Sequence, residues 1–417
     1  MTLQVLTPQY TGRKPTLTIF YQFDPWNTTI GGIQTIIRTF IKYAPDEFNV
    51  QLVGTATNSS IALRQWHEQE YEGCVVRFMP LFMLQNDNVR GVIPTTLRYT
   101  AALAGQRFSS DFLHFHRLEP TLASFGWQGD KTLFIHNDIH KQMVSASGGK
   151  QAILWRHFPQ AYFTLERMLV KQFSQIFSCN SESAQLYQQL YPQVADRVKL
   201  IRNTVDNDIF YPTTLRQKNE RRLQLAKSMN LPEDTRFILF AGRLHPQKDP
   251  LLLVRSLAAL NDPRVHLLIA GEGELADEIR AEGLRLQVSQ HMTLLGAMNQ
   301  QELADLHRLS SALVLTSIYE GLPLVVLEAL ACGTPIVTTN CGETPRLLNP
   351  HSGLVATDRT PDAIAESIRA VVFNPERFST DGCLQAARPY SAQEVIHSIY
   401  SDMLHRWQPK ELSTASL

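Results

Sequence analysis

Short apolar runs rich in β-branched residues alternate with helical patterns along almost the whole chain, and this alternation limits the possible folds strongly. Glycine or proline punctuates the sequence between the runs, which lie at residues 17–21, 50–53, 74–78, 112–115, 132–135, 175–178, 198–201, 237–240, 265–269, 292–295, 312–315 and 335–338. Strands that alternate with helices predict right-handed crossovers and parallel sheets covered on both faces. Because twelve strands in 417 residues are too many for one comfortable sheet, we expect two doubly wound α/β domains.

The break between the domains is expected near residues 203–235, where polar turns and a basic helical pattern interrupt the alternation. We therefore predict a first domain over residues 1–205 and a second over residues 206–389. The remaining residues, 390–417, have apolar side chains at helical spacing and no strand after them, which predicts a C-terminal helix.

Composition excludes several classes of protein. Lysine plus arginine and aspartate plus glutamate both number 39, so the net charge of zero argues against a nucleic-acid binder. No apolar run is long enough to span a bilayer, and the first residues lack the apolar core of a signal peptide. The five cysteines are scattered and odd in number, which favours a reducing compartment over a disulfide framework or a zinc site. We expect a cytoplasmic protein.

The most informative stretch, residues 312–338, predicts a strand, a loop, a helix and a second strand. With Pro323 at the first helical position, the amides of Leu324 and Val325 are unsatisfied donors, and such a helix start binds anions well. Glu320 lies in the loop before this helix, and Glu328 lies within it. The first carboxylate is suited to a sugar hydroxyl and the second to a ribose.

Two cations follow the predicted strand 237–240. Arg243 and Lys248 lie beyond its carboxyl end, where open α/β sheets bind their ligands. A planar bidentate donor and a point charge together suit a diphosphate.

Glycines after two other strands are weaker signals. Gly271 and Gly273 satisfy the spacing of a dinucleotide fingerprint, but the acidic residue that should follow about 20 residues later is missing, which disfavours an NAD site. Gly31 and Gly32 open a helical pattern after the first strand and would let the backbone approach a ligand closely.

Histidines gather near two strand ends in the first half. His114 and His116 form a His-x-His pair, which is a metal signal only if a third ligand joins them, and no such ligand has a convincing spacing. His136 follows the strand 132–135 and is the better candidate for a contact with substrate.

Taken together, the sequence resembles the retaining glycosyltransferase family 4. The resemblance rests on GRLHPQKDP, on AGEGEL, and on the E-x7-E element from Glu320 to Glu328, and it extends more weakly to DFLHFHR, FIHND and IRNTVDNDIFYP in the first half. It implies a GT-B fold, in which two Rossmann-like domains face a central cleft and the last helix crosses back to the first domain. The first domain would then hold the acceptor and the second the nucleotide sugar.

The resemblance also implies roles for individual residues. Arg243 and Lys248 would hold the diphosphate of the donor, Glu328 its ribose and Glu320 the transferred sugar, with His136 against the sugar ring. Of these, Glu320, His136, Arg243 and Lys248 would be catalytic.

Further donor contacts are implied for small or backbone groups. The amides of Leu324 and Val325 would meet the distal phosphate or the sugar. The backbone of Leu295 and Gly296 would recognise the base, and the glycines Gly31, Gly32 and Gly271 would give the donor close access.

The resemblance predicts retention of configuration by departure of the diphosphate from the face that the acceptor attacks. The cations and the helix start would neutralise the developing charge, so no metal and no cofactor are expected. The chain departs from the family's common pattern at Pro323 and Thr204, where glycine is usual. Neither change removes a charged group.

Donor and acceptor identities stay open. We expect a nucleotide diphosphate sugar, with UDP favoured over GDP, and a hydroxyl acceptor on a glycan, a lipid or a small molecule. The alternatives are a catalytically silent GT-B protein that binds sugar nucleotides and an enzyme of the phosphorylase type.

Contact with a membrane is a further expectation. Residues 1–200 carry 18 basic and 14 acidic side chains, and the segment 95–108 places Arg98 and Arg107 beside an apolar stripe. This pattern is typical of a helix on an anionic membrane face, here the inner one, and the alternative is a helix packed on its own sheet.

Overall fold

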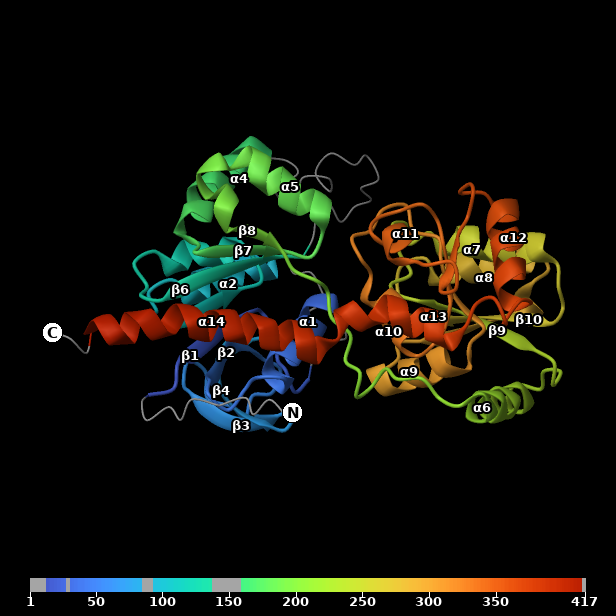
Figure 1. Cartoon of the computed structure of the whole chain (residues 1–417), viewed down its shortest axis with the longest axis horizontal. Coiled ribbons are helices and arrows are strands. Elements are labelled where there is room, and N and C mark those ends of the chain that lie inside the picture. The colour runs from blue at the N-terminus through green and yellow to red at the C-terminus, as the bar shows by residue number, and fades with distance from the viewer. Residues whose placement is uncertain (1–12, 28–30, 85–92, 137–158, 415–417) are drawn as a thin grey trace, which may run out of the picture.

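Two parallel sheets, one from each half of the chain, form the frame of the computed structural model (Figure 1). The structure describes residues 13–27, 31–84, 93–136 and 159–414. Within these residues the first sheet has eight strands and the second has six. Both sheets carry helices on both faces, so each half is a Rossmann-like α/β layer structure, and the predicted fold class is confirmed.

The first sheet has the strand order β3-β4-β2-β1-β5-β6-β7-β8, and all its pairs are parallel except β3 with β4. Its strands are β1 (Thr16–Phe20), β2 (Asn49–Ala56), β3 (His67–Tyr71), β4 (Cys74–Met83), β5 (Phe112–Phe115), β6 (Asp130–Ile135), β7 (Gln175–Ser178) and β8 (Val198–Leu200). The helices of this half are α1 (Gly32–Lys42), α2 (Thr95–Leu103), α4 (Pro159–Leu169) and α5 (Ser181–Leu190).

The second sheet has the order β11-β10-β9-β12-β13-β14, and all its pairs are parallel. Its strands are β9 (Arg236–Ala241), β10 (Val265–Ala270), β11 (Met292–Gly296), β12 (Ala312–Leu315), β13 (Ile336–Thr338) and β14 (Gly353–Val355). The helices are α6 (Leu215–Ser228), α7 (Pro250–Leu260), α8 (Ala276–Arg285), α9 (Gln300–Leu309), α10 (Leu324–Ala331), α11 (Thr344–Leu347), α12 (Pro361–Val372) and α13 (Thr380–Ala387).

The central strands are buried on both faces, which explains why their sequences are continuous apolar runs. Every residue of β5, β10 and β12 is buried. Two strands were not predicted. The sequence of β3 is largely polar because this edge strand pairs on one side only, and β14 has only three residues.

Strand order reverses once in each sheet, and these reversals position the candidate site. In the first sheet the chain passes from β1 outward through β2, then returns to β5 on the other side of β1. In the second sheet β9 lies between β10 and β12 in the same way. Ligands of such sheets bind outside the carboxyl ends of the strands at the reversal.

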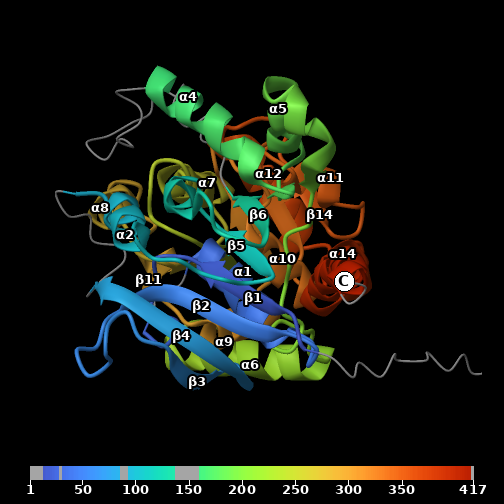
Figure 2. The same cartoon turned by 90° about the vertical axis from the view of Figure 1, so that its left-hand side faces the viewer.

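The C-terminal helix α14 (Ala392–Thr414) begins beside the second half and runs along the first sheet, away from the second half (Figures 1 and 2). Ile399 and Met403 are buried in the same hydrophobic cluster as Leu17 of β1, and the Tyr400 hydroxyl donates to the carbonyl of Phe40 at 2.8 Å. Helix α14 therefore joins the core of the first domain.

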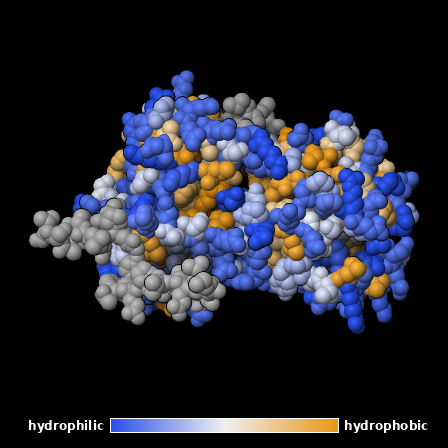
Figure 3. Space-filling view, viewed as in Figure 1, coloured by the Kyte–Doolittle hydropathy of each residue, from blue (hydrophilic) through white to orange (hydrophobic). Residues whose placement is uncertain are grey.

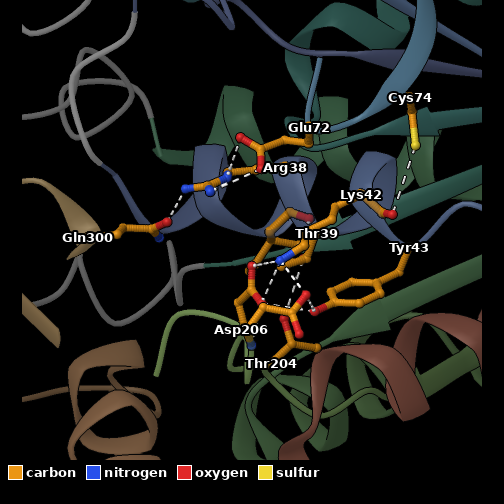
Figure 4. Close-up of polar contacts among 11 residues, drawn as sticks. Arg38, Thr39, Lys42, Tyr43, Glu72, Cys74, Thr204, Asp206 and Gln300 are labelled. Carbon is orange, nitrogen blue, oxygen red and sulfur yellow. Dashed lines mark hydrogen bonds and ion pairs between the residues drawn. The ribbon is translucent and has the colours of Figure 1, made fainter. Parts of the chain in front are cut away.

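The chain passes between the two halves at two places that lie side by side. The amide of Val205 donates to the carbonyl of Tyr390, and the amide of Ala392 donates to the carbonyl of Val205, each at 2.9 Å. Lys42 of helix α1 forms an ion pair at 2.8 Å with Asp206, which lies in the first of these two connecting segments (Figure 4).

A second polar contact of α1 reaches the other half directly. The Arg38 guanidinium donates to Glu72 of the first half at 3.0 Å and also to the side chain of Gln300 at the start of α9 (Figure 4). Helix α1 thus connects the first sheet both to the linker and to the second domain.

Candidate functional site

Two opposite charges meet where the second sheet reverses its strand order. Lys248 follows β9 and Glu320 follows β12, and the Lys248 ammonium forms an ion pair with the Glu320 carboxylate. The Ser317 hydroxyl donates to the same carboxylate oxygen at 3.0 Å. Both charged side chains are mostly buried, at 15% and 11% exposure. The structure therefore brings two predicted site residues together at the expected edge.

Hydrogen bonds join the two loops that carry this pair. The Thr316 hydroxyl contacts the carbonyls of Lys248 and Asp249 at 3.0 and 2.8 Å, and the amide of Ile318 donates to the carbonyl of Gln247 at 2.9 Å. Asp249 caps α7 by accepting from the amide of Leu252. The backbone around Lys248 is thus fixed by its neighbours.

Arg243 lies beside this pair, at the carboxyl end of β9, and its side chain is exposed. Within the described residues it forms neither an ion pair nor a hydrogen bond through its side chain. A Cβ atom at the preceding residue, Gly242, would lie 3.7 Å from the Cε of Lys248, so the Lys248 side chain passes beside the backbone that leads into Arg243. Arg243 is free to engage an anion.

The glycines after β10 pack the loops against each other. A Cβ atom at Gly271 would lie 2.0 Å from the carbonyl oxygen of Gly242, and one at Gly273 would lie 2.3 Å from that of Leu244. The amide of Gly271 donates to the carbonyl of Gly296 at 2.7 Å. Their spacing is therefore explained by close approach of three backbone segments.

This packing predicts a large loss of stability on substitution of Gly271. Gly271→Ala adds a methyl group onto a carbonyl at a φ of 139°, and we expect it to lower the free energy of unfolding by about 3 kcal/mol or more. Gly126 also has a positive φ, 79°, but open space around it, so Gly126→Ala should cost about 1 kcal/mol. Equal losses of unfolding free energy in the two variants, measured by urea unfolding, would show that the close backbone contact at Gly271 does not affect stability.

The start of α10 faces the start of α1 across the two halves. A Cβ atom at Gly32 would lie 3.8 Å from the Cδ1 of Leu324, so Gly32 and the first residue of α10 are neighbours. Pro323 is the N-cap with extended backbone, φ −65° and ψ 134°, and our placement of it at the first helical position is wrong by one residue. The error has a physical cause, because proline fixes φ at a value that both positions accept. Leu324 and Val325 remain the first two helical amides, which have no partner within a helix.

Glu328 is buried in α10 and forms an ion pair with none of the residues that the structure describes. Its side chain is 7% exposed, and its Oε2 atom has no hydrogen-bond partner in the described part of the chain. Burial raises the pKa of this carboxyl to about 8. Glu328 is thus a buried acid, one turn into the helix, with one oxygen left without a partner among the described residues.

The end of β11 carries a bulge at the residues expected to meet the base. The pairing of β10 with β11 runs from Ile269 opposite Leu294 to Ala270 opposite Gly296, so Leu295 is displaced from the ladder. Gly296 has a φ of 76°. The bulge frees the backbone of Leu295 at the sheet edge, while the carbonyl of Gly296 already accepts from Gly271.

His136 follows β6 and lies in the first half, away from the ion pair. The structure gives it no hydrogen bond or ring contact to any described residue of the second half. It contacts His116 instead, with 2.9 Å between His136 Nε2 and His116 Nδ1. Burial and the nearby charge of Arg117 lower the pKa of His136 to about 3.

Two hollows share His136 in their walls. The first is open to solvent and lies between α1, the linker and α14, with Asn203 and Thr204 among its lining residues. The second is also open to solvent and lies beside Arg117, Tyr162 and Tyr187. On the face shown in Figure 3, hydrophobic surface lies on both sides of the junction between the domains.

Several residues that join the halves near the site were not predicted. The Asn203 side chain donates to the carbonyl of Leu322 at 2.7 Å, and the amide of Ser181 donates to Glu343 at 3.2 Å. Gly342 is tightly packed, because a Cβ atom there would lie 2.3 Å from the carbonyl oxygen of Gly321. Only the position of Gly342 after a strand could have indicated this contact, since the others depend on how the two halves meet.

The described residues contain no group of three or more histidine, cysteine, aspartate or glutamate residues placed to hold a metal ion. Among the same residues, no helix combines the length and hydropathy needed to cross a bilayer. The apolar residues Tyr99 and Leu103 of α2 are buried in the core of the first domain.

The second half of the chain is similar in sequence to known glycosyltransferases. Residues 222–380 match the family model described as Glycosyl transferases group 1. An uncharacterized glycosyltransferase of Methanocaldococcus jannaschii is 26% identical over 236 residues, covering 56% of this chain and 59% of that protein. The D-inositol 3-phosphate glycosyltransferase of Stackebrandtia nassauensis is 32% identical over 224 residues, covering 51% and 49%. These matches span between about half and three fifths of each relative's own length.

Solved structures match almost the entire chain. Sucrose-phosphate synthase from Thermosynechococcus elongatus superposes with a TM-score of 0.75 at 19% identity, covering 95% of this chain and 100% of that one. Alr3699/HepE of Anabaena, solved in complex with UDP and glucose, gives a TM-score of 0.69 at 16% identity, covering 94% and 100%. The fold of this chain is GT-B.

Proposed function

We propose that this protein is a retaining glycosyltransferase that moves a hexose from a nucleotide diphosphate sugar to a hydroxyl acceptor. The observation that carries the proposal is the convergence of Lys248, Glu320 and the start of α10 at the reversal of the second sheet, with Gly32 of the other half facing that helix start. The match of residues 222–380 to group 1 glycosyl transferases supports it.

We infer that the donor's diphosphate binds between the two cations, Arg243 and Lys248, and the start of α10. Arg243 is exposed and free to form a bidentate contact, while Thr316 fixes the backbone of Lys248 and Glu320 pairs with its ammonium. The amides of Leu324 and Val325 add the positive end of the helix dipole. Gly31 and Gly32 bring the start of α1 to the same place without side chains, so the phosphates can approach.

The rest of the donor is assigned by position along the sheet edge. We infer that Glu328 accepts hydrogen bonds from the ribose, since its Oε2 atom has no partner among the described residues. The displaced backbone at Leu295, together with Gly296, would contact the base, and Gly271 keeps that edge compact. Glu320 and His136 would contact the sugar. A uridine nucleotide is favoured because UDP and UDP-glucose were found in complexes of HepE.

In the reaction, the bond between the anomeric carbon and the diphosphate oxygen breaks as the acceptor oxygen attacks from the same face. The acceptor's proton passes to the departing phosphate oxygen, so atoms and charge balance. Arg243, Lys248 and the helix start stabilise the negative charge on the leaving group. Glu320 is placed to stabilise positive charge on the sugar ring.

We propose that residues 1–205 hold the acceptor, that residues 206–389 hold the donor, and that residues 390–417 tie the second domain back to the first. We also propose that the enzyme works in the cytoplasm, since all five cysteines are free thiols and suit a reducing compartment. Contact of the segment 95–108 with the inner membrane face would rest on Arg98 of α2 and on Arg107 beyond it, because Tyr99 and Leu103 are already buried.

A panel of radiolabelled nucleotide sugars, offered with glycan, lipid and small-molecule acceptors, tests this function. We expect transfer from one donor with retained anomeric configuration, determined by NMR of the product. Activity should survive EDTA, because protein cations meet the phosphate charge. Activity that EDTA abolishes and that magnesium or manganese restores would contradict the metal-independent mechanism.

Substitution of the two glutamates should change different steady-state constants, kcat for Glu320 and the donor KM for Glu328. Glu320→Gln removes a charge beside the reacting sugar, so we expect a lower kcat with little change in the donor KM. Glu328→Gln alters a contact that substrate and transition state share, so we expect mainly a raised donor KM. A kcat loss confined to Glu328→Gln would reverse these roles.

A further inference from the structure

The contact between His116 and His136 has the geometry of a hydrogen bond between two rings lying edge to edge. The nitrogens are 2.9 Å apart, the ring planes differ by only 9°, and the ring centroids are 5.1 Å apart. A single proton lies between His116 Nδ1 and His136 Nε2, because a neutral histidine carries one N–H and one lone pair.

His116 is fixed in its orientation. It is 2% exposed, and its ring stacks on Phe134 with centroids 4.7 Å apart and planes 6° apart. Tyr21 and Phe40 meet the same ring edge-on at 6.3 and 6.4 Å. A ring enclosed in this way keeps its plane, and the contact with His136 selects Nδ1 as the atom that His116 presents to it.

The remaining nitrogen of His116 decides which ring donates. Its Nε2 atom is buried and has no partner among the described residues. A buried N–H without an acceptor costs more than a buried lone pair without a donor, so the proton of His116 belongs on Nδ1. Burial lowers the pKa of both rings, most strongly in His116, so both are neutral at pH 7. His116 then donates to His136 Nε2, and the proton of His136 lies on its own Nδ1.

We infer that His116 is a positioning residue, which holds His136 with its Nδ1–H group directed to a ligand as a hydrogen-bond donor. Within the described residues, Nδ1 of His136 has no other partner. The inference rests on the proposed function in one respect, namely that His136 meets the donor sugar. A fixed donor there selects a sugar that presents an oxygen acceptor, such as a hydroxyl group, over a deoxy sugar.

The tautomer of His136 can be measured without any substrate. Long-range proton–nitrogen NMR of the full-length protein, with histidines labelled, separates protonated from unprotonated ring nitrogens, and His136→Gln and His116→Phe assign the signals. We expect His136 to be protonated at Nδ1 in the wild type and to revert toward the ordinary Nε2–H form in His116→Phe. His136 protonated at Nε2 in the wild type would overturn the inference.

A matched control lies two residues away. His114 is 1% exposed and contacts Phe40 and Phe134 from the same face, but neither of its nitrogens has a partner among the described residues. His114→Phe should therefore leave the His136 tautomer and the kinetics unchanged. His116→Asn keeps a donor near the place of Nδ1 and should rescue the tautomer that His116→Phe loses.

Kinetics then test the link to function. With an active donor, kcat/KM should fall about five- to tenfold in His116→Phe and recover in His116→Asn. Unchanged kinetics in a folded His116→Phe that has lost the tautomer would remove the positioning role. If the tautomer is as inferred but no nucleotide sugar is transferred, the proposed function fails while the hydrogen bond stands.

Discussion

Replacing either cation of the donor site, the unpaired Arg243 or the ion-paired Lys248, should reduce kcat/KM by about 10²–10³-fold. Lys248→Met and Arg243→Met keep the aliphatic stem and remove the charge that would meet the departing diphosphate, which is the effect of losing one preorganised stabilising group. Lys248→Met also leaves the Glu320 carboxylate without its partner. We expect the loss mainly in kcat, measured with the donor that the radiolabel panel identifies.

Controls for these variants are exposed cations of the same domain. Lys227 at the end of α6 and Arg280 on α8 are exposed and lie outside the site, so Lys227→Met and Arg280→Met should retain full activity. Near-normal turnover in either site variant, with its fold shown intact by circular dichroism, would exclude that cation from the chemistry.

Glu328→Gln should stabilise the protein at neutral pH, although it weakens donor binding. The folded pKa of about 8 lies above the ordinary 4.5, so the unfolded chain loses this proton between about pH 4.5 and 8 while the folded chain keeps it. The folded state then binds more protons, and stability falls as pH rises through that window. Glutamine does not ionise, so the variant should be more stable by about 1–3 kcal/mol at pH 7.5, because its buried amide offsets part of the gain.

The pH dependence distinguishes this effect from simple repacking. The stability advantage of Glu328→Gln over wild type in urea unfolding should disappear near pH 4.5, where only the cost of the buried amide remains. Glu282 is an opposite control, since hydrogen bonds from Arg285 and Arg255 lower its pKa to about 2. Glu282→Gln should destabilise the protein at neutral pH and lose this effect toward pH 2. A pH-independent gain in Glu328→Gln would mean that its carboxyl is not held neutral.

The fold was predictable because strands that are buried on both faces of a parallel sheet have continuous apolar sequences. The strands β5, β7 and β12 have the predicted bounds, and the others differ by a few residues at their ends. The edge strand β3 was missed because one-sided pairing leaves room for charged residues. Sequence patterns detect burial, and β3 has little.

The sequence predicted which site residues follow which strand, but not the contacts between the two halves. Lys248 and Glu320 could each be assigned to a strand end, and adjacency of β9 and β12 brings them together. The contacts from Asn203 to Leu322 and from Ser181 to Glu343 depend on how the two halves meet, which no local pattern encodes. The bond between His116 and His136 likewise arises from the pairing of β5 with β6.

The central claim is a diphosphate site formed by Lys248, Arg243 and the start of α10, and isothermal titration calorimetry tests it most directly. UDP and GDP should be compared with UMP and GMP on the wild type and on Lys248→Met. We expect one diphosphate to bind at least about tenfold more tightly than its monophosphate, since the second phosphate gains charge-assisted hydrogen bonds, and Lys248→Met should remove most of that difference. Equal affinity for diphosphate and monophosphate, or no binding of either by the folded protein, would contradict the account.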